Sequence, residues 1–336
     1  MHQNTYKRFE QTLLDFAGAI ADTPLESLTD EAAFEPLVAL LHSCELDSNQ
    51  RTDEKLRIHI AIHLLHFGVI AVPSLLAYVR KEPCADEFNT PGYPLRDLHA
   101  HTTSRYVIVE HLGDHNYAGT FDGLLQLFTV CRNHFVVEYL AVSLMKIDPQ
   151  KALPSIAHRL LTDNTTAIRL SIAKVLQEHP HPDSMFSLII ALKDPTPQIA
   201  SLAALALGKL KLPAAFPFLL NALLDMSSTD TSLQQNIHLI DNLVTAIQTY
   251  DTEEARHVVL EWAVDALWND NLSIEVIAIK QLGELKENRA IPYLIEYYHR
   301  GKTKPVSLSY SIKEALSTID TPEAHAALKM LNNPVP

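Results

Sequence analysis

The chain has 336 residues and a formal net charge of −13, and 47% of its residues are hydrophobic. It contains only 9 glycines, and Ala and Leu dominate the apolar set, which favours long helices over strands. The acidic balance argues against nucleic acid as a partner and favours proteins that carry basic patches. Three widely spaced cysteines without a CxxC pair, Cys44, Cys84 and Cys131, exclude a disulfide framework and a zinc knuckle. Reduced thiols fit a cytoplasmic protein.

The first segment, residues 1–29, is predicted to be an amphipathic helix that caps the rest of the fold. Its apolar residues recur at helical spacing. They are Tyr6, Phe9, Leu13, Phe16 and Ile20. Glu10 and Asp15 interrupt the apolar stretch and no basic segment precedes it, so we expect no secretory signal. Charged residues and prolines also interrupt the later apolar region, residues 186–226, so we expect no membrane span.

An internal repeat occupies residues 30–320 and predicts about eight pairs of helices. Its mark is an apolar residue, a Pro or a substitute, any residue, and then two apolar residues. The aligned second positions are Pro36, Pro73, Asp122, Pro154, Phe186, Pro217, His257, Pro292 and His325. Each position lies in the first turn of a helix, here named helix A, where a Pro is tolerated. We expect helices A to begin near residues 30, 70, 117, 150, 182, 213, 252 and 289.

A second helix, named helix B, follows in each repeat. Residues 194–210 are the best example, because a turn at Asp194-Pro195 precedes an apolar stripe at helical spacing. The stripe consists of Ile199, Leu202, Ala203, Ala206 and Leu210. We expect helices B to begin near residues 52, 98, 133, 165, 196, 231, 272 and 305. A terminal cap helix over residues 321–332 is expected after Thr321-Pro322, an N-cap followed by Pro at the first helical position.

The pattern in residues 150–211 resembles HEAT repeats, especially the short bacterial kind first recognised in phycobilin lyases. The resemblance rests on Asp194-Pro195, Ile199, Ala203-Ala204 and Ala206-Leu207-Gly208, and on Ile168-Arg169 at the usual Val-Arg position. Ser104-Arg105 is a looser match, whereas Ala200 and Glu275 depart from the Arg. The likeness covers roughly residues 30–332. It implies an all-α fold, a right-handed α-α superhelix of the HEAT and armadillo kind, whose concave side is lined by helices B.

Two surfaces are candidates for binding a protein partner. On helices B, the resemblance implies that Arg105, Lys174, Gln198, Ser201 and Lys280 face a ligand. At the edge where helix A connects to helix B, named the A-to-B edge, three connections are long, namely residues 45–52, 83–97 and 225–231. The longest, 83–97, carries Phe88, Tyr93 and Arg96, and long surface loops often bind partners. The alternative is that both aromatics fold back onto the second repeat.

Catalytic chemistry finds little support in the sequence. His59, His63 and His66 share one helical face, as zinc or iron ligands can, but they fall on the expected core stripe without a neighbouring carboxylate. We therefore predict no metal and no cofactor. The chain has no His-Glu dipeptide of the kind that binds iron in deoxyhypusine hydroxylases, which have a similar architecture. Its only two tryptophans, Trp262 and Trp268, lie near Glu261 and Asp265, unlike the basic face of HEAT-like DNA glycosylases.

The preferred interpretation is thus a protein-binding adaptor or regulatory scaffold without catalytic residues. The alternative is an accessory enzyme, such as a subunit of a phycobilin or tetrapyrrole lyase or a metal-dependent modifier. For a lyase, Cys84 is the candidate nucleophile.

Overall fold

The computed structural model describes residues 34–35, 37–39, 41, 60–65, 67–80, 95–227, 236–269, 271–300 and 306–332, with the backbone alone for 95–104, 227 and 306. Regular structure in these ranges is helical throughout, and no strand occurs among them. The predicted all-α solenoid class is therefore confirmed. The chain divides into two compact units, residues 1–175 and residues 176–336. The predicted cap at residues 1–29 lies outside the described residues.

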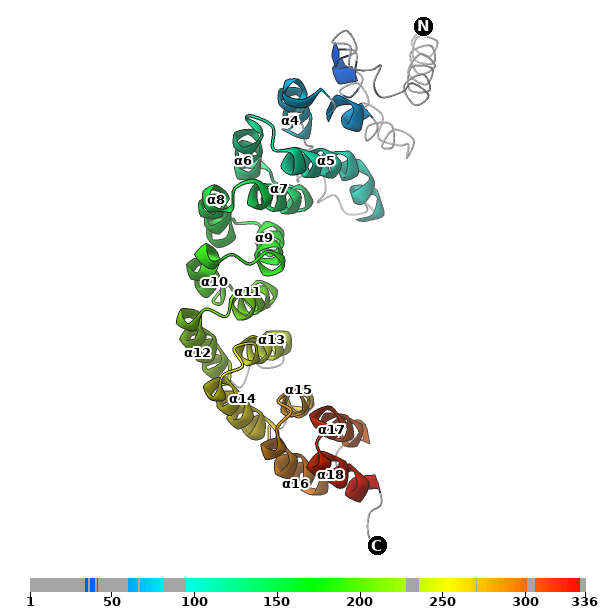
Figure 1. Ribbon diagram of the computed structural model, residues 1–336, viewed down its shortest axis with the longest axis vertical. Coiled ribbons are helices and arrows are strands. Elements are labelled where there is room, and N and C mark those ends of the chain that lie inside the picture. Colours follow the sequence, from blue (N-terminus) through cyan, green and yellow to red (C-terminus); the bar gives the residue numbers. More distant parts are fainter. Residues whose placement is uncertain are drawn as a thin grey trace. The chain divides into compact units, whose positions relative to one another are not determined.

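The first unit contains three helical pairs between residue 68 and the boundary. In chain order its elements are η3 (Gly68–Ala71), α4 (Val72–Arg80), α5 (Leu95–His115), α6 (Thr120–Val130), α7 (His134–Ile147), α8 (Pro149–Thr162) and α9 (Thr166–Glu178), within which the boundary falls. Helices A pack on helices A, as α4 does on α6, and helices B pack on helices B, as α5 does on α7. Figure 1 shows the two rows.

The second unit repeats this arrangement. Its elements are η5 (Pro182–Ser184), α10 (Met185–Ala191), α11 (Pro197–Leu210), η6 (Pro213–Ala215), α12 (Phe216–Ser227), α13 (Ile237–Gln248), α14 (Glu253–Ala266), α15 (Leu272–Glu284), η7 (Asn288–Ala290), α16 (Ile291–Arg300), α17 (Val306–Ile319) and α18 (Pro322–Asn332). Helices α10, α12, α14 and α16 form the A row, and α11, α13, α15 and α17 form the B row (Figure 1). In the B row, α11 packs on α13 and α15 on α17.

Helix starts follow the polar signals in the sequence. The side chains of Asn133, Asp148, Thr252 and Asn271 accept backbone N–H bonds in the first turns of α7, α8, α14 and α15, which stabilises these helix ends. Thr321 accepts a bond from the Ala324 amide at 3.3 Å, so α18 begins as Thr-Pro predicts. One start differs, since α13 begins at Ile237 rather than near residue 231.

Five helices B, namely α5, α11, α13, α15 and α17, are followed by a left-handed residue that reverses the chain toward the next helix A. Asn116, Lys211, Asp251, Lys286 and Asp320 all have positive φ, between 43° and 53°. Glycine is the usual residue at this position because it lacks a Cβ. Here its place is taken by polar residues, which keep the turn short and leave a side chain at the edge where helix B connects to helix A, named the B-to-A edge.

Glycines set the spacing between successive helices B. A Cβ built on Gly208 of α11 would lie 2.8 Å from the Cα of Ala246 in α13, and one on Gly283 of α15 would lie 2.8 Å from the Cα of Ala315 in α17. In the first unit, a Cβ built on Gly113 of α5 would lie 2.6 Å from the Cβ of Ser143 in α7. Gly113, Gly208 and Gly283 therefore each stand where a helix B closely approaches the next helix B.

Buried polar groups join helices within the core. The Arg159 guanidinium donates to the backbone oxygens of Phe128 and Cys131 and forms an ion pair of 2.6 Å with Asp163. Glu275, which stands where HEAT repeats usually have Arg, is buried and accepts a hydrogen bond of 2.8 Å from the Tyr297 hydroxyl. These bonds offset the cost of removing the polar groups from water.

Candidate partner-binding site

Two cavities lie at the A-to-B edge of the second unit. The first, the α12/α14 cavity, has a volume of about 540 Å³. Its apolar lining comes mainly from α12 and α14, and it reaches the starts of α13 and α15. The lining residues are Leu220, Leu223, Leu224, Ile240, Val258, Glu261, Trp262, Asp265, Ala266, Asn269 and Ile274. Both its volume and its apolar character are typical of binding sites.

The second, the α10/α12 cavity, has a volume of about 500 Å³ and lies on the other side of α12. It is bounded by the end of α10, the turn before α11, the end of α12 and the start of α13. Its lining includes Ile189, Leu192, Phe218, Met226 and Leu239. The two cavities thus lie on either side of α12, whose last turn contains the start of the predicted long segment 225–231; residues 228–231 lie outside the described residues.

Large apolar side chains are exposed beside these cavities. Phe218 and Leu224 of α12 line one cavity each and are 46% and 56% exposed. On α10, Phe186 and Ile190 are also exposed, one turn apart on one face of the helix. Scattered exposed apolar residues are normal, but apolar groups that gather at a cavity mark an interaction surface.

The charges at the α12/α14 cavity are acidic. Among its described lining residues, the charged ones are Glu261 and Asp265, one turn apart on α14. The surrounding sequence has the same bias, since residues 212–279 contain ten Asp or Glu and a single basic residue, Arg256. That segment has a net charge of −9, most of the charge of the chain. This charge run is a signal that the sequence-based prediction overlooked.

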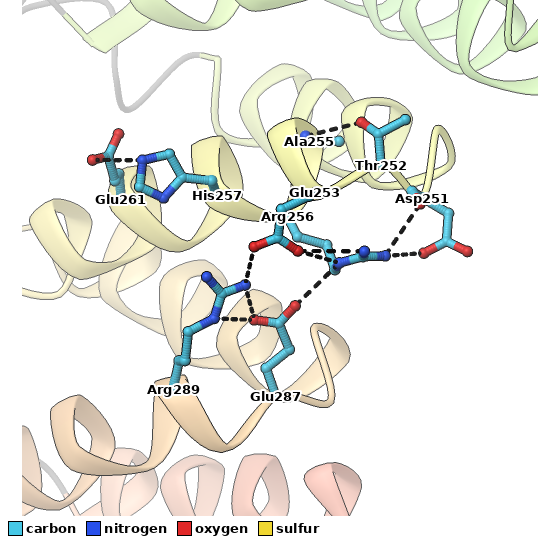
Figure 2. Close-up of polar contacts among 9 residues, drawn as sticks. All are labelled: Asp251, Thr252, Glu253, Ala255, Arg256, His257, Glu261, Glu287 and Arg289. Atoms are coloured by element: carbon cyan, nitrogen blue, oxygen red, sulfur yellow. Dashed lines mark hydrogen bonds and ion pairs between the residues drawn. The ribbon is translucent and has the colours of Figure 1, made fainter.

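Arg256 is held by carboxylates at the B-to-A edge, away from the cavity (Figure 2). It pairs with Asp251 at 2.6 Å and with Glu287 of the next repeat at 3.2 Å. Arg289 pairs with Glu287 at 2.6 Å and with Glu253 at 3.0 Å. The charge of Arg289 is the main reason that the pKa of Glu253 is lowered. The one basic residue of the acidic segment is therefore already engaged in a network that links consecutive repeats.

The lysines predicted on helices B form ion pairs with the preceding helix B. Lys174 of α9 lies 2.6 Å from Glu138 of α7, and Lys280 of α15 lies 3.1 Å from Asp241 of α13. Lys146 of α7 makes the equivalent contact with Asp114 of α5 at 2.8 Å. The hydrogen bond from Lys146 is the main reason that the pKa of Asp114 is lowered. These lysines link repeats, and a partner would have to compete with the internal carboxylates.

The other predicted partner-binding residues differ in accessibility and in whether the structure describes them. Gln198 is exposed at the start of α11, whereas Ser201 of the same helix is buried. Arg105 is also buried, with its guanidinium carbon 5.5 Å from the centre of the Tyr78 ring. We therefore remove Arg105 and Ser201 from the proposed surface, because neither is accessible to a partner. Arg96 lies in α5. Phe88 and Tyr93 lie outside the described residues.

The structure describes one of the three histidines considered as metal ligands. His63 is half-buried, while His59 and His66 lie outside the described residues. Within the described ranges, no group of three or more His, Cys, Asp or Glu could hold a metal ion. The absence of a metal stays a prediction. Likewise, no described helix combines the length and apolar character needed to cross a membrane.

Comparison with known proteins identifies the repeat. The family model of HEAT repeats matches residues 156–236. No curated protein matches the chain. Among solved structures, YibA of Escherichia coli is similar with a TM-score of 0.43 and 16% identity, over 78% of this chain and 96% of that one. Human deoxyhypusine hydroxylase is similar with a TM-score of 0.31 and 19% identity, over 80% of this chain and 94% of that one.

The phycocyanin lyase complex of CpcE and CpcF from Nostoc sp. PCC7120 gives a TM-score of 0.34 and 14% identity, over 75% of this chain and 97% of that one. Structural likeness at this level carries no function from these proteins to this chain. The family match is more specific, because it falls on the segment in which the sequence pattern is clearest. Residues 156–236 therefore match HEAT repeats, as the pattern in residues 150–211 predicts.

Proposed function

We propose that the chain is a protein-binding scaffold and that its second unit binds a partner at the A-to-B edge. The observation that carries this proposal is the pair of cavities on either side of α12, bordered by the exposed Phe218 and Leu224. Stacked repeats need only a short turn between helices A and B, as residues 193–196 illustrate. Apolar cavities at the A-to-B edge are not needed for the repeats to stack, so a partner that fills them is the best explanation for them.

The proposal keeps one of the two surfaces that the sequence predicts. On helices B, Lys174 and Lys280 pair internally and Ser201 is buried. At the A-to-B edge, residues 83–97 were expected to contribute most, but residues 83–94 lie outside the described residues. For the accessory-enzyme alternative, the candidate nucleophile Cys84 also lies outside the described residues, and Cys131 is buried.

A paired-variant capture experiment tests the proposal. The full-length chain, Phe218→Ser/Leu224→Ser and Tyr310→Ser/Met330→Ser are each immobilised, and proteins captured from extract of the source cells are quantified by mass spectrometry. The control variant removes two apolar side chains from the same unit, and these are more exposed, at 71% and 63%. Because all four side chains are partly in water, both variants should fold, which circular dichroism verifies.

We expect the Phe218/Leu224 variant to lose one reproducible set of proteins that the wild type and the control retain. Truncation of central apolar contacts typically weakens an interface by about 2 kcal/mol or more. Equal capture by all three chains would refute the proposed edge. Loss by both variants would show that capture depends on general hydrophobicity and not on this site.

A further inference from the structure

The chemistry of the α12/α14 cavity points to a partner of one kind. We infer that the cavity binds a peptide segment in which a large apolar side chain stands next to Lys or Arg. This inference rests on the proposed function and goes further by naming what the partner presents. Its basis is charge complementarity, because the cavity is apolar inside and carries carboxylates and no cation among the described residues that line it.

The two carboxylates are positioned at the mouth of the cavity. Glu261 and Asp265 lie one turn apart on α14, and both are exposed. Trp262 lies between them in sequence and lines the apolar part together with Leu224 of α12. A Leu or Phe side chain can enter the apolar part, while the long stem of an adjacent Lys or Arg covers Trp262 and carries its charge to the carboxylates.

Within the described part of this unit, few cations compete for this position. Arg256 is bound by Asp251 and Glu287, and Lys280 is bound by Asp241. The one described group that reaches the carboxylates is His257, whose Nε2 lies 3.2 Å from a Glu261 oxygen (Figure 2). A contact across one exposed helical turn contributes little to stability. An incoming guanidinium, which can bind a carboxylate through two parallel hydrogen bonds, replaces it readily.

The acidic segment also accounts for attraction at longer range. Its net charge of −9 over residues 212–279 produces a local negative field, whereas much of the remaining chain is closer to neutral. Such a field speeds the approach of a basic segment and repels an acidic one, and salt weakens both effects. The apolar cavity then supplies the contact that distinguishes a matching segment from any other basic one.

Three synthetic peptides test the inference on the full-length chain. The first combines Lys and Leu on an amphipathic pattern, the second has Glu in place of Lys, and the third has Ser in place of Leu. Binding is measured by calorimetry and by the emission of Trp262 in a Trp268→Phe background. The protein variants are Glu261→Gln/Asp265→Asn and, as a control with the same loss of charge, Glu254→Gln/Glu314→Gln, whose residues are exposed elsewhere in this unit.

We expect saturable binding of the Lys/Leu peptide alone, and about tenfold weaker binding to the Glu261/Asp265 variant. The control variant should bind within about threefold of the wild type, since exposed charges beyond a Debye length are screened. Equal binding of the Lys/Leu and Glu/Leu peptides would overturn the inference, and so would equal binding of the Lys/Ser peptide. If captured cellular partners depend on Leu224 but not on Glu261 and Asp265, the proposed function stands and this inference fails.

Discussion

Gly208→Ala is expected to destabilise the chain, although alanine is the better helix former. Alanine gains about 1 kcal/mol over glycine inside a helix. Against this, the new Cβ would lie 2.8 Å from the Cα, 2.9 Å from the Cβ and 3.1 Å from the backbone oxygen of Ala246. Two of these atoms belong to the backbone of α13, so no rotamer change relieves the contact. Separating two packed helices is a case of overpacking, which costs about 1–3 kcal/mol.

The net loss should therefore be about 1 kcal/mol, the middle of a range of about 0–2 kcal/mol. The thermal midpoint should fall accordingly, by about 2–4 °C per kcal/mol for a unit of this size. Gly123→Ala is the matched control, because its Cβ would meet only the end of the flexible Leu76 side chain. That variant should be neutral or stabilised. Thermal unfolding followed by circular dichroism measures both. A higher midpoint for Gly208→Ala would refute the idea that this glycine sets the spacing of helices B.

Three further predictions concern buried and titrating groups. Arg159→Met should lower the free energy of unfolding by about 3 kcal/mol, because Asp163 and two backbone oxygens lose their donor; a loss below about 1 kcal/mol in denaturant titration would contradict this. Lys146→Met should raise the pKa of Asp114 toward its ordinary value. Since that pKa is lowered in the folded chain, the stability it contributes is present at neutral pH and disappears as the pH falls through the folded pKa; an unchanged carboxyl titration by NMR would refute the assignment. Burial raises the pKa of Tyr250 to about 12, so its contribution is present below pH 10 and lost toward pH 12; Tyr250→Phe should remove this component from alkaline unfolding followed by absorbance, and an identical wild-type curve would exclude it.

Local sequence signals predicted the helices well because the residues that begin each helix and those that pack it lie close together in the sequence. Helix starts expected near 150, 165 and 196 appear at Pro149, Thr166 and Pro197. Proline at the first turn and small residues at the B-to-B contact act within one or two turns of the chain. The predicted start of α13 near residue 231 was wrong, since the helix begins at Ile237. The number of repeats stays a prediction.

The site was harder to predict because it depends on contacts between repeats. Whether Lys174 is available to a partner is decided by Glu138, which lies a full repeat earlier and reaches it only after the helices stack. The cavities arise in the same way from the separation of α12 and its neighbours, which periodicity does not encode. The acidic run at residues 212–279, by contrast, was readable from the sequence and needed only a count of charges along the chain.

The two edges of the second unit differ in mechanical stiffness. At the B-to-A edge, Arg256, Glu287 and Arg289 tie one turn to the next, and Asn288 continues the chain of bonds to Thr321 and Glu323. The opposite edge contains cavities, where fewer atoms resist compression. When this unit bends, the B-to-A edge should therefore act as the hinge axis, and the largest displacements should occur at the A-to-B edge, where the cavities lie. Because exposed ion pairs hold the B-to-A edge together, salt should weaken it. The ionic strength should then change how far the helices separate at the A-to-B edge.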